Sequence, residues 1–562
     1  MDCSTSTLAT SYAITTECTG TAVVTCGDIT GLAPGSWRHS ISVIAPSTGQ
    51  IQHQSSLLIA NSTPNRVRFT AFPTVLTVRS GASSGADTFR TVLEGTAAAP
   101  KPVLIQFDPA AFPDGVATRI PLDSALPALT ADDVTIDGTD ASGATGNRII
   151  DAAGLPISAL AITGARNHIV GLRLTNAGGN NRDTLNIAGA RADANVIEGS
   201  LIEGAATGDG IGVDQQAGKG FDATVNVIRD CEVWGASDKG IKVTTGSYAR
   251  VLHTWVHGNA NGGIQATIAG HVQAWQNLVE DNRGSTAQNG LSANGGNDPS
   301  FPGNSELQSW ANISRGNGAN GVSVRGLSLA VIQDDYLAAN GSSGLRIFND
   351  VGPPAAAVVA GTSAVCNGVD GAVVANTSLA DFGGGLFGGP GDNAFTQNNL
   401  PAGGANLRNA TGLQVGAIND QWEHCGRATT CDEAAIAAYD LSDHGAHTTI
   451  TPAQAHRSLV PPVLESVAPT RGRRGALLRI FGSGFNVIDG HFAEDKCADV
   501  AGRNQCVPLR GNCVQIDGIP VYVEAVTPRM LVVRWPFTCV EPVSLVVKTE
   551  HGGTSTPMTV CE

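Results

Sequence analysis

The sequence predicts an all-β chain in which a solenoid of parallel strands lies between two small β-sandwich modules. Three observations support this. A Gly followed by alternating apolar residues recurs through the middle of the chain, and both ends show period-2 alternation broken by turn residues. The composition, with 69 Gly among 562 residues, 42% hydrophobic and only 5% aromatic side chains, suits many short strands joined by tight turns.

The first module is expected over residues 1–75. The segments "TAVVTCGDI", "WRHSISVIAP" and "IQHQSSLLIA" alternate apolar and polar positions and are separated by the turn sequences "GLAPGS" and "PSTG". Short strands at this spacing are typical of a small β-sandwich.

A repeat defines the middle of the chain. The motif appears as "DTLNI" at 183, "DGIGV" at 209, "KGIKV" at 239 and "GGIQA" at 262, and returns at 289, 320, 343 and 370. A second apolar strand, such as "NVIEGSLI" or "RVLHTWVH", recurs between successive copies. A unit of this length cannot bury its apolar face alone, so the copies must stack on one another.

These coils resemble the right-handed parallel β-helix repeats of the pectate-lyase-like superfamily over roughly residues 98–415. The asparagines in "NANGG", "AQNGL" and "GANGV" resemble the turn asparagines that such coils stack into ladders. The segment "TVRSGASSGADTFRTVLEG" before the repeats is expected to supply an amphipathic helix that closes the N-terminal end. The predicted fold class is therefore a right-handed parallel β-helix over residues 76–415, with its N-terminal cap, flanked by small immunoglobulin-like β-sandwich domains.

The C-terminal part changes in character. Residues 416–460 are expected to form a linker with a small loop closed by Cys425 and Cys431. Residues 461–562, with "PPVLESVAPTRGRRGALLRIFGSGFN" and later "PVSLVVKTEHGG", are similar to IPT/TIG domains, which are immunoglobulin-like modules.

Charge and cysteine content restrict the partners and the compartment. A net charge of −15 argues against nucleic acid, and no apolar run is long enough to span a membrane. The twelve cysteines are concentrated at the two ends, which predicts disulfides in the flanking modules, with Cys425–Cys431 first and Cys539–Cys561 tying the last strands. We therefore expect an extracellular or cell-surface protein whose signal peptide has been removed, since "MDCSTSTLAT" does not resemble one; the oligomeric state stays open.

Outward positions of adjacent coils place charged residues together. Only six lysines occur in the chain, and three lie between 219 and 242 among several aspartates. Stacking predicts that equivalent positions lie about 4.8 Å apart on one wall. One such row contains Asn186, Gly212, Lys242, Gln265, Ser292, Ser323 and Arg346, and neighbouring rows contain Asp183, Asp209, Asp214 and Lys239.

The resemblance implies chemistry for this wall. β-Helix enzymes of this superfamily that cleave uronate polymers by β-elimination often bind calcium through aspartates and use a Lys or Arg as the base. Asp183, Asp209 and Asp214 are then the expected calcium ligands. Lys242 is the expected base, with Lys239 as the cation that lowers its pKa.

Further candidates lie on neighbouring strands. His253 and His257, in "LHTWVHG", are candidate acids or bases. The galacturonan hydrolases of this fold carry an Asp pair and an "RIK" segment that this chain lacks at the required places, which disfavours that class. The expected substrate-binding side chains are outward polar and aromatic residues: Asn186, Gln265, Trp234, Trp255 and Arg346.

Three functions follow from these observations. The first is a secreted or cell-surface protein that acts on polysaccharide, with lyase chemistry on a uronate polymer. The second is a non-catalytic adhesin that binds glycans or other proteins. The third is a purely structural solenoid whose charged wall serves solubility, since surface ion pairs contribute little stability.

Overall fold

The computed structural model describes the strand backbones of residues 36–44 and 51–60, and residues 73–561 apart from short gaps. The gaps are residues 180–181, 285–287, 297–299, 301–302, 351, 399–403, 424–430, 444–446, 454–459, 488–510 and 550–552. None of the helices in this described part has the length and apolar character that crossing a membrane requires.

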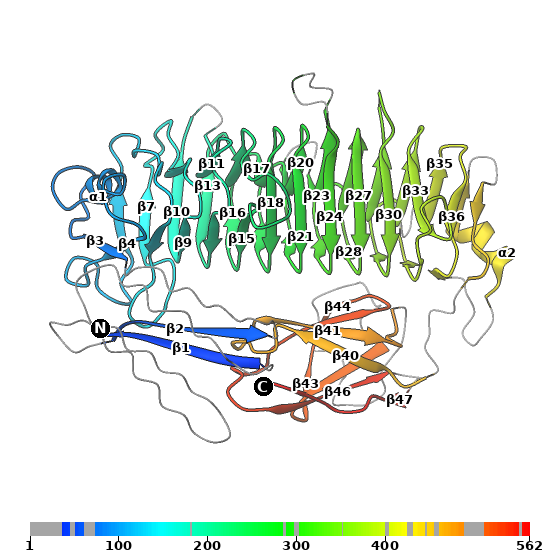
Figure 1. Cartoon of the computed structure of the whole chain (residues 1–562). Helices are drawn as coiled ribbons and strands as arrows, with labels where there is room; N and C mark the ends of the chain where they lie inside the picture. Colours follow the sequence, from blue (N-terminus) through cyan, green and yellow to red (C-terminus); the bar gives the residue numbers. More distant parts are fainter. Residues whose placement is uncertain are drawn as a thin grey trace.

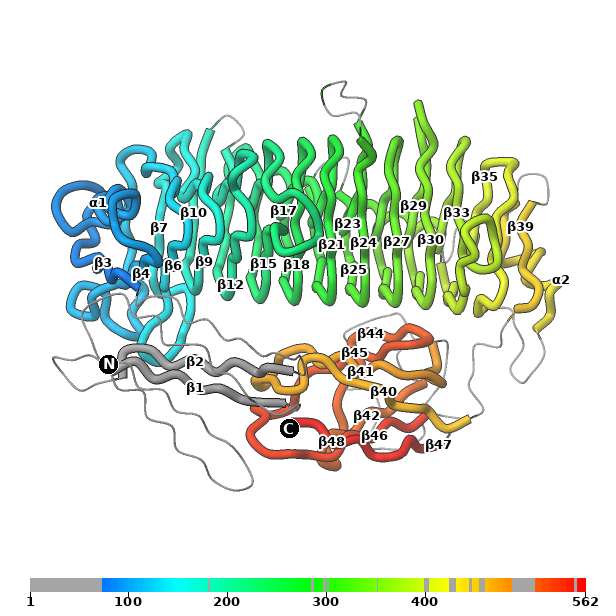
Figure 2. The backbone as a smooth tube through the Cα atoms, in the orientation of Figure 1, coloured from blue at the N-terminus to red at the C-terminus, as the bar shows by residue number. Residues whose placement is uncertain are grey.

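Three parallel sheets wrap into a solenoid that runs the length of the molecule (Figure 1). Sheet 1 has 14 strands from β3 (Thr74–Val78) to β39 (Thr448–Thr449), and sheet 2 has 12 strands from β5 (Thr118–Pro121) to β37 (Gln421–Trp422). Sheet 3 has 11 strands from β8 (Leu160–Ile162) to β38 (Leu441–Asp443). From β6 (Val134–Asp137) onward, successive strands of the solenoid fall on sheets 1, 2 and 3 in turn, and the tube in Figure 2 shows the resulting stack of coils. The predicted all-β parallel β-helix is confirmed.

Sheet 3 carries the repeated Gly motif. Its central strands are β11 (Leu185–Ala188), β14 (Ile211–Asp214), β17 (Lys239–Val243), β20 (Gly262–Thr267), β23 (Asn289–Gly295), β26 (Val322–Gly326) and β29 (Leu345–Phe348). Alternate apolar side chains of these strands, such as Ile241 and Val243, are fully buried in the solenoid core, and the residues between them face outward.

Asparagine ladders hold the turns of neighbouring coils together. In the longest ladder each side-chain amide donates to the side-chain oxygen on the next coil, at 2.9–3.0 Å; its members are Asn259, Asn282, Asn317, Asn340, Asn367 and Asn398. Asn289 and Asn320 form a second, shorter ladder beside sheet 3. The amides of the longest ladder are buried and satisfy one another, which keeps the cost of burying them low.

Both ends of the solenoid are closed by apolar side chains. Helix α1 (Phe89–Gly95) buries Phe89, Val92 and Leu93 at the N-terminal end, as the sequence predicts. At the other end Trp422 and Ile436 are fully buried. The sheets continue through β36 (Val415–Ala417) to β39, so much of the segment expected to be a linker, residues 416–460, belongs to the last coils.

The predicted N-terminal sandwich lies largely outside the described residues. Two of its strands, β1 (Ser36–Ile44) and β2 (Ile51–Ala60), are described and pair antiparallel.

The C-terminal module consists of two antiparallel sheets. One contains β40 (Val463–Ala468), β41 (Leu477–Ser483), β45 (Met530–Arg534) and β44 (Val523–Val526). The other contains β43 (Ile519–Val521), β42 (Asn512–Ile516), β46 (Val543–Thr549), β47 (Gly553–Thr554) and β48 (Met558–Val560). The predicted Cys539–Cys561 disulfide is present. Cys431 is also disulfide-bonded, but Cys425 lies outside the described residues, so that pairing stays a prediction.

This module packs against sheet 2 of the solenoid (Figure 1). Phe481 stacks on Trp310 with ring centroids 5.2 Å apart, and Glu524 pairs with Arg315 at 3.1 Å. Arg479 is buried and donates hydrogen bonds from Nε to the Ala311 carbonyl and from Nη2 to the Asn277 carbonyl. The module therefore covers part of sheet 2 and is held there by directional contacts as well as apolar area.

Candidate functional site

The outward row predicted from the repeat is present on sheet 3. Strand register pairs its members one coil after another, in the order Asn186, Gly212, Lys242, Gln265, Ser292, Ser323 and Arg346. Lys242 is half-buried between the inward residues Ile241 and Val243. The row therefore forms a continuous outer wall on which two cavities lie.

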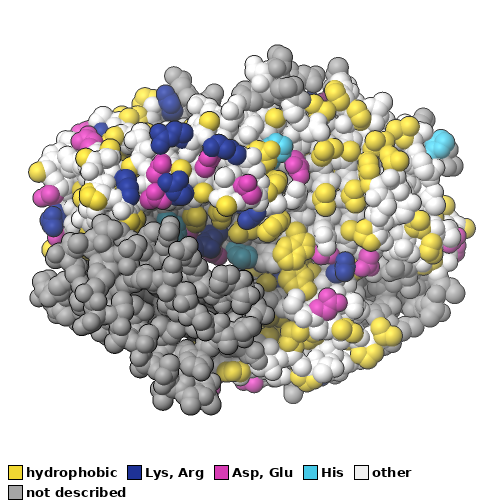
Figure 3. Space-filling model, in the orientation of Figure 1, with side chains coloured by type: hydrophobic (Ala, Val, Ile, Leu, Met, Phe, Trp, Pro, Cys, Tyr) yellow, Lys and Arg dark blue, Asp and Glu magenta, His cyan; other side chains and the backbone are white. Residues whose placement is uncertain are grey.

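The first cavity, the carboxyl pocket, has a volume of about 220 Å³. Its lining is formed by Asp183, Thr207, Gly208, Asp209, Gly212, Asp214, Asp238, Lys242 and Thr244. Four of these nine residues carry carboxylic acids and one carries an amine, so the pocket is strongly polar. Figure 3 shows that acidic and basic side chains are intermixed toward the N-terminal end of the visible face of the molecule, while much of the remainder is apolar or uncharged.

Asp183 and Asp209 occupy a structural position that is filled by asparagine on two later coils and by Asp370, paired with Arg408, on another. The Asp183 Oδ1 accepts the Asp209 N–H at 3.0 Å, and the Asp209 Oδ1 accepts the Lys239 N–H at 2.8 Å. Further along sheet 3, Asn289 and Asn320 accept the backbone N–H of the next coil with the same atom. An amide therefore suffices for this ladder, and the second carboxyl oxygen of each aspartate is not needed for it.

Burial perturbs both acids. Burial, followed by the negative charge of Asp209, raises the pKa of Asp183 to about 7. Burial also raises the pKa of Asp209, which is only 5% exposed, but Lys242 opposes this shift from 3.4 Å. The pair therefore consists of one acid that holds its proton near neutral pH and one whose carboxylate is stabilised by an ammonium group.

Lys242 remains a cation in this site. Burial alone would lower its pKa, but Asp209 and Asp238 outweigh burial and raise it. Lys239 does not act as the expected cationic neighbour, because its Nζ contacts Asp238 Oδ1 at 2.9 Å while Lys242 contacts Asp238 Oδ2 at 3.5 Å. The expectation that Lys239 lowers the pKa of Lys242 is therefore wrong, since a carboxylate lies between the two amines.

The calcium site expected at Asp183, Asp209 and Asp214 stays a prediction, and the described side chains give it no support. Among the described residues, no group of three or more His, Cys, Asp or Glu side chains is arranged to hold a metal ion. The Asp214 carboxylate instead accepts the Gln215 N–H at 2.5 Å and the Thr245 hydroxyl. Asp183, Asp209 and Asp214 therefore line one pocket, with the Asp214 carboxylate already accepting two hydrogen bonds.

Gly212 makes room for the acid pair. A Cβ at this position would lie 1.9 Å from the Asp183 Oδ2, so only glycine allows that oxygen to occupy the space beside the strand. Asp238, at 3.5 Å from Lys242, completes the charged pocket. The sequence predictions missed both residues as site components, although Asp238 stands four positions before Lys242 in the same charged segment.

The predicted histidines and tryptophans lie on another wall. Trp234 in β16 (Glu232–Trp234), and Trp255 and His257 in β19 (Trp255–His257), belong to sheet 2. His257 stacks on Trp255 with ring centroids 3.9 Å apart and contacts Glu232 at 3.1 Å. His253 lies in the turn before β19, against Asp230 and Gln276. None of the four lines the carboxyl pocket, so their predicted roles beside Lys242 are not supported.

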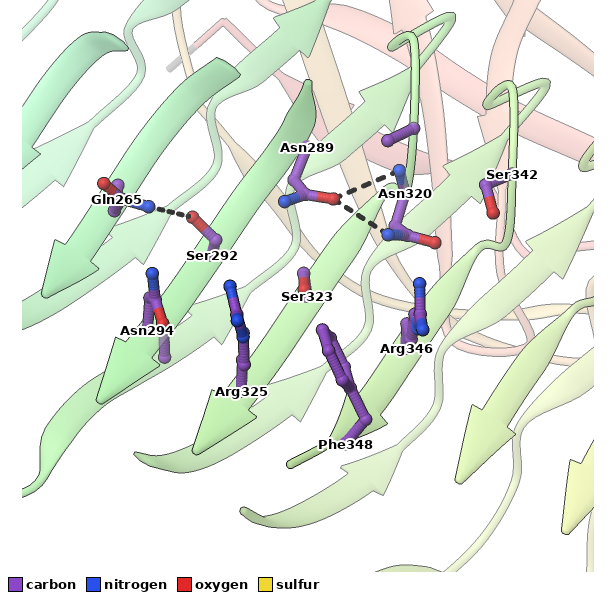
Figure 4. A pocket seen from close by; sticks show the side chains of 12 residues that line it. Gln265, Asn289, Ser292, Asn294, Asn320, Ser323, Arg325, Ser342, Arg346 and Phe348 are labelled. Atoms are coloured by element: carbon purple, nitrogen blue, oxygen red, sulfur yellow. Dashed lines mark hydrogen bonds between the residues drawn. The ribbon is translucent and has the colours of Figure 1, made fainter. Parts of the chain in front are cut away.

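The second cavity, the arginine cavity, lies further along the same wall and has a volume of about 340 Å³. Gln265 and Arg346, both predicted to bind substrate, line it together with Arg325 and Phe348 (Figure 4). Asn186 lies on the other side of the carboxyl pocket, one coil before Gly212, and its buried Oδ1 has no hydrogen-bond partner in the described structure.

The fold and the site define a parallel β-helix protein with an acid–amine pocket on one outer wall. No family model matches the chain and no curated protein matches it, so the IPT/TIG resemblance stays a prediction. Among solved structures, the A-module of a mannuronan C-5 epimerase from Azotobacter vinelandii is 15% identical, with a TM-score of 0.42, over 67% of this chain and 96% of that chain.

Two tailspike proteins are also similar. The Dettilon tailspike protein is 11% identical over 84% of this chain and 81% of its own, with a TM-score of 0.36. The tailspike of Acinetobacter baumannii bacteriophage Fri1, a capsular polysaccharide depolymerase, is 9% identical over 95% of this chain and 98% of its own, with a TM-score of 0.31. Similarity at this level carries no information on activity, so function is inferred from the residues of the site.

Proposed function

We propose that this chain is an extracellular or cell-surface glycan-active protein whose carboxyl pocket hydrolyses a glycosidic bond. The observation that supports this best is the placing of two aspartates at ladder positions for which an asparagine suffices elsewhere. Burying a carboxylic acid costs more than burying an amide, so its retention favours a chemical role. The Cys539–Cys561 disulfide and the disulfide-bonded Cys431 support an oxidising compartment.

The two acids suit the two roles that hydrolysis requires. Asp183, with its pKa raised to about 7, is the general acid and gives its proton to the glycosidic oxygen as the bond from that oxygen to the anomeric carbon breaks. Asp209, beside the Lys242 ammonium, is the carboxylate that accepts a proton from the water whose oxygen bonds to the anomeric carbon. Lys242 thereby keeps the base ionised, and Gly212 gives the acid its position.

β-Elimination on a uronate polymer is the second candidate. Because the pKa of Lys242 is raised, Lys242 stays protonated and another residue must act as the base. In that chemistry the Lys242 ammonium neutralises the sugar carboxylate, and Asp183 rather than a free amine removes the proton alpha to it. The C–O bond at the beta carbon then breaks, the departing oxygen takes a proton from water to become a hydroxyl, and a carbon–carbon double bond remains in the other product. A non-catalytic adhesin is the remaining alternative.

The experiment compares Asp183→Asn and Asp209→Asn with the native protein on a panel of neutral and acidic polysaccharides. New reducing ends without ultraviolet absorbance indicate hydrolysis, and new ends with absorbance indicate elimination. Each variant keeps the ladder acceptor and should fold, while losing a factor of about 10² to 10⁴ in rate. Asp222→Asn, in an exposed turn outside the pocket, is the matched control and should leave the rate unchanged. Cleavage by Asp183→Asn at the native rate contradicts the proposal, and cleavage of no substrate by the native protein favours the adhesin.

A further inference from the structure

The two cavities of sheet 3 have opposite electrostatic character. The carboxyl pocket is lined by four aspartates, whereas the lining of the arginine cavity contains Arg325 and Arg346 and no acidic residue. An anionic group is therefore repelled at the first and attracted at the second. This difference lies along one continuous row of outward residues.

Arg346 is a cation without a carboxylate partner among the described residues, and its side chain is half-buried in β29. Its guanidinium carbon lies 4.1 Å from the centroid of the Phe348 ring, a contact that fixes the orientation of the planar group. Arg325 lies 5.7 Å from the same ring and pairs with Asp350, so its charge is already partly satisfied. Figure 4 shows the Phe348 ring between the two arginines.

Neutral polar groups complete the cavity. Gln265 donates to the Ser292 hydroxyl at 3.3 Å, and Asn289, Asn294 and Ser323 also line the cavity (Figure 4). Amides and hydroxyls of this kind hydrogen-bond to sugar hydroxyls, while a guanidinium fork matches a carboxylate with two parallel hydrogen bonds. Together these groups suit a sugar ring that carries a carboxylate.

We propose that the arginine cavity binds a carboxylate-bearing sugar unit of the glycan that is cut in the carboxyl pocket. The part of this inference that concerns cleavage rests on the proposed function. The part that concerns binding is argued from the residues of the arginine cavity alone. Arg346 is four strand steps from Lys242 along the row, which is about 19 Å at the usual strand spacing. The acidic unit therefore lies several sugars away from the bond that breaks and fixes which bond enters the carboxyl pocket.

Binding is measured with the Asp183→Asn variant, so that recognition is observed whether or not cleavage occurs. The probes are polygalacturonate, alginate, hyaluronan and heparosan, each beside its carboxyl-reduced form, with dextran sulfate as a sulfate-bearing polymer. We expect at least one acidic polymer to bind about tenfold or more tightly than its reduced form. Adding Arg346→Gln should weaken that binding about 10- to 100-fold, the usual effect of losing a charge-assisted pair.

Two further variants make the result specific. Arg191→Gln removes the same charge from an exposed arginine outside the cavity and should leave binding unchanged. Lys242→Met should preserve the discrimination between acidic and reduced polymers, because the carboxylate does not lie in the carboxyl pocket. Equal binding of the reduced forms, full binding by Arg346→Gln, binding of dextran sulfate alone, or binding of no probe overturns the proposal. Failure of hydrolysis with intact Arg346-dependent binding would reject only the proposed function.

Discussion

Replacing Asp183 by Asn is expected to stabilise the protein at alkaline pH. In the folded state the pKa of Asp183 is raised to about 7 from 3.8, because the carboxyl is buried beside Asp209. The folded state therefore holds this proton more tightly than the unfolded state does. The contribution of Asp183 to the free energy of unfolding is thus unaffected below pH 4 and declines as pH rises from about 4 through 7.

The magnitude follows from the size of the shift. About three pKa units at 1.36 kcal/mol each give roughly 4 kcal/mol of lost stability once the group is fully ionised. The asparagine keeps the ladder acceptor but must hydrate its amide nitrogen in the pocket, so we expect a net gain of about 2 to 4 kcal/mol at pH 8.5. For a unit the size of the solenoid this corresponds to roughly 2 to 5 °C in Tm.

The assay is differential scanning calorimetry of both proteins at pH 4, 7 and 8.5. The difference in Tm should be near zero at pH 4 and grow with pH. Asp222→Asn is the control, and its effect on Tm should have the opposite sign. The backbone and side chain of Thr224 lower the pKa of exposed Asp222, so its ionised form stabilises the folded state and its loss should not raise Tm at pH 8.5. If the native protein and Asp183→Asn have the same Tm at pH 8.5, ionisation of Asp183 does not destabilise the folded state and the argument is refuted.

Three more substitutions test the site and the domain contact. Gly212→Ala places a methyl group on the Asp183 Oδ2 and should reduce turnover about 10²-fold or more while circular dichroism shows an unchanged fold. Lys242→Met removes the charge that opposes the raised pKa of Asp209, so the acid limb of the pH–rate profile should move to higher pH; an unmoved limb would exclude Asp209 as the base. Arg479→Met removes the donor to the Ala311 carbonyl and one of the two donors to the Asn277 carbonyl, which still accepts the Ile313 N–H, and should cost about 1 to 3 kcal/mol, seen as faster proteolysis between the C-terminal module and the solenoid.

The repeat made the coils and the outward row predictable from the sequence. Alternation fixes which side chains are buried, and a slip of one residue would turn Ile241 and Val243 outward, so the register of the whole row follows. This is why Lys242, Gln265 and Arg346 fall on one wall as expected.

The repeat did not predict which of the three sheets carries a given outward residue. Trp255 and His257 recur with the period of the repeat, but they lie on a different sheet, and period alone does not specify the angle between walls. Asp183 and Asp209 were expected on one wall, but as calcium ligands, because the repeat does not reveal how deeply their carboxyl groups are buried or that the Asp183 Oδ1 accepts the Asp209 N–H across coils. The last coils lack the Gly motif, and residues 416–460 were therefore expected to form a linker, although the strands of this segment continue the solenoid as far as β39.

The register of sheet 3 has a consequence for how specificity can change over evolution. The separation between the two cavities is a whole number of coils, since each intervening strand pairs residue for residue with its neighbour. Duplication or loss of a single coil would alter that separation by one increment of about 4.8 Å without rebuilding either cavity. A change in the number of coils alone would thereby match the distance between the cavities to a glycan with a different repeating unit, and the residues of each cavity would stay the same.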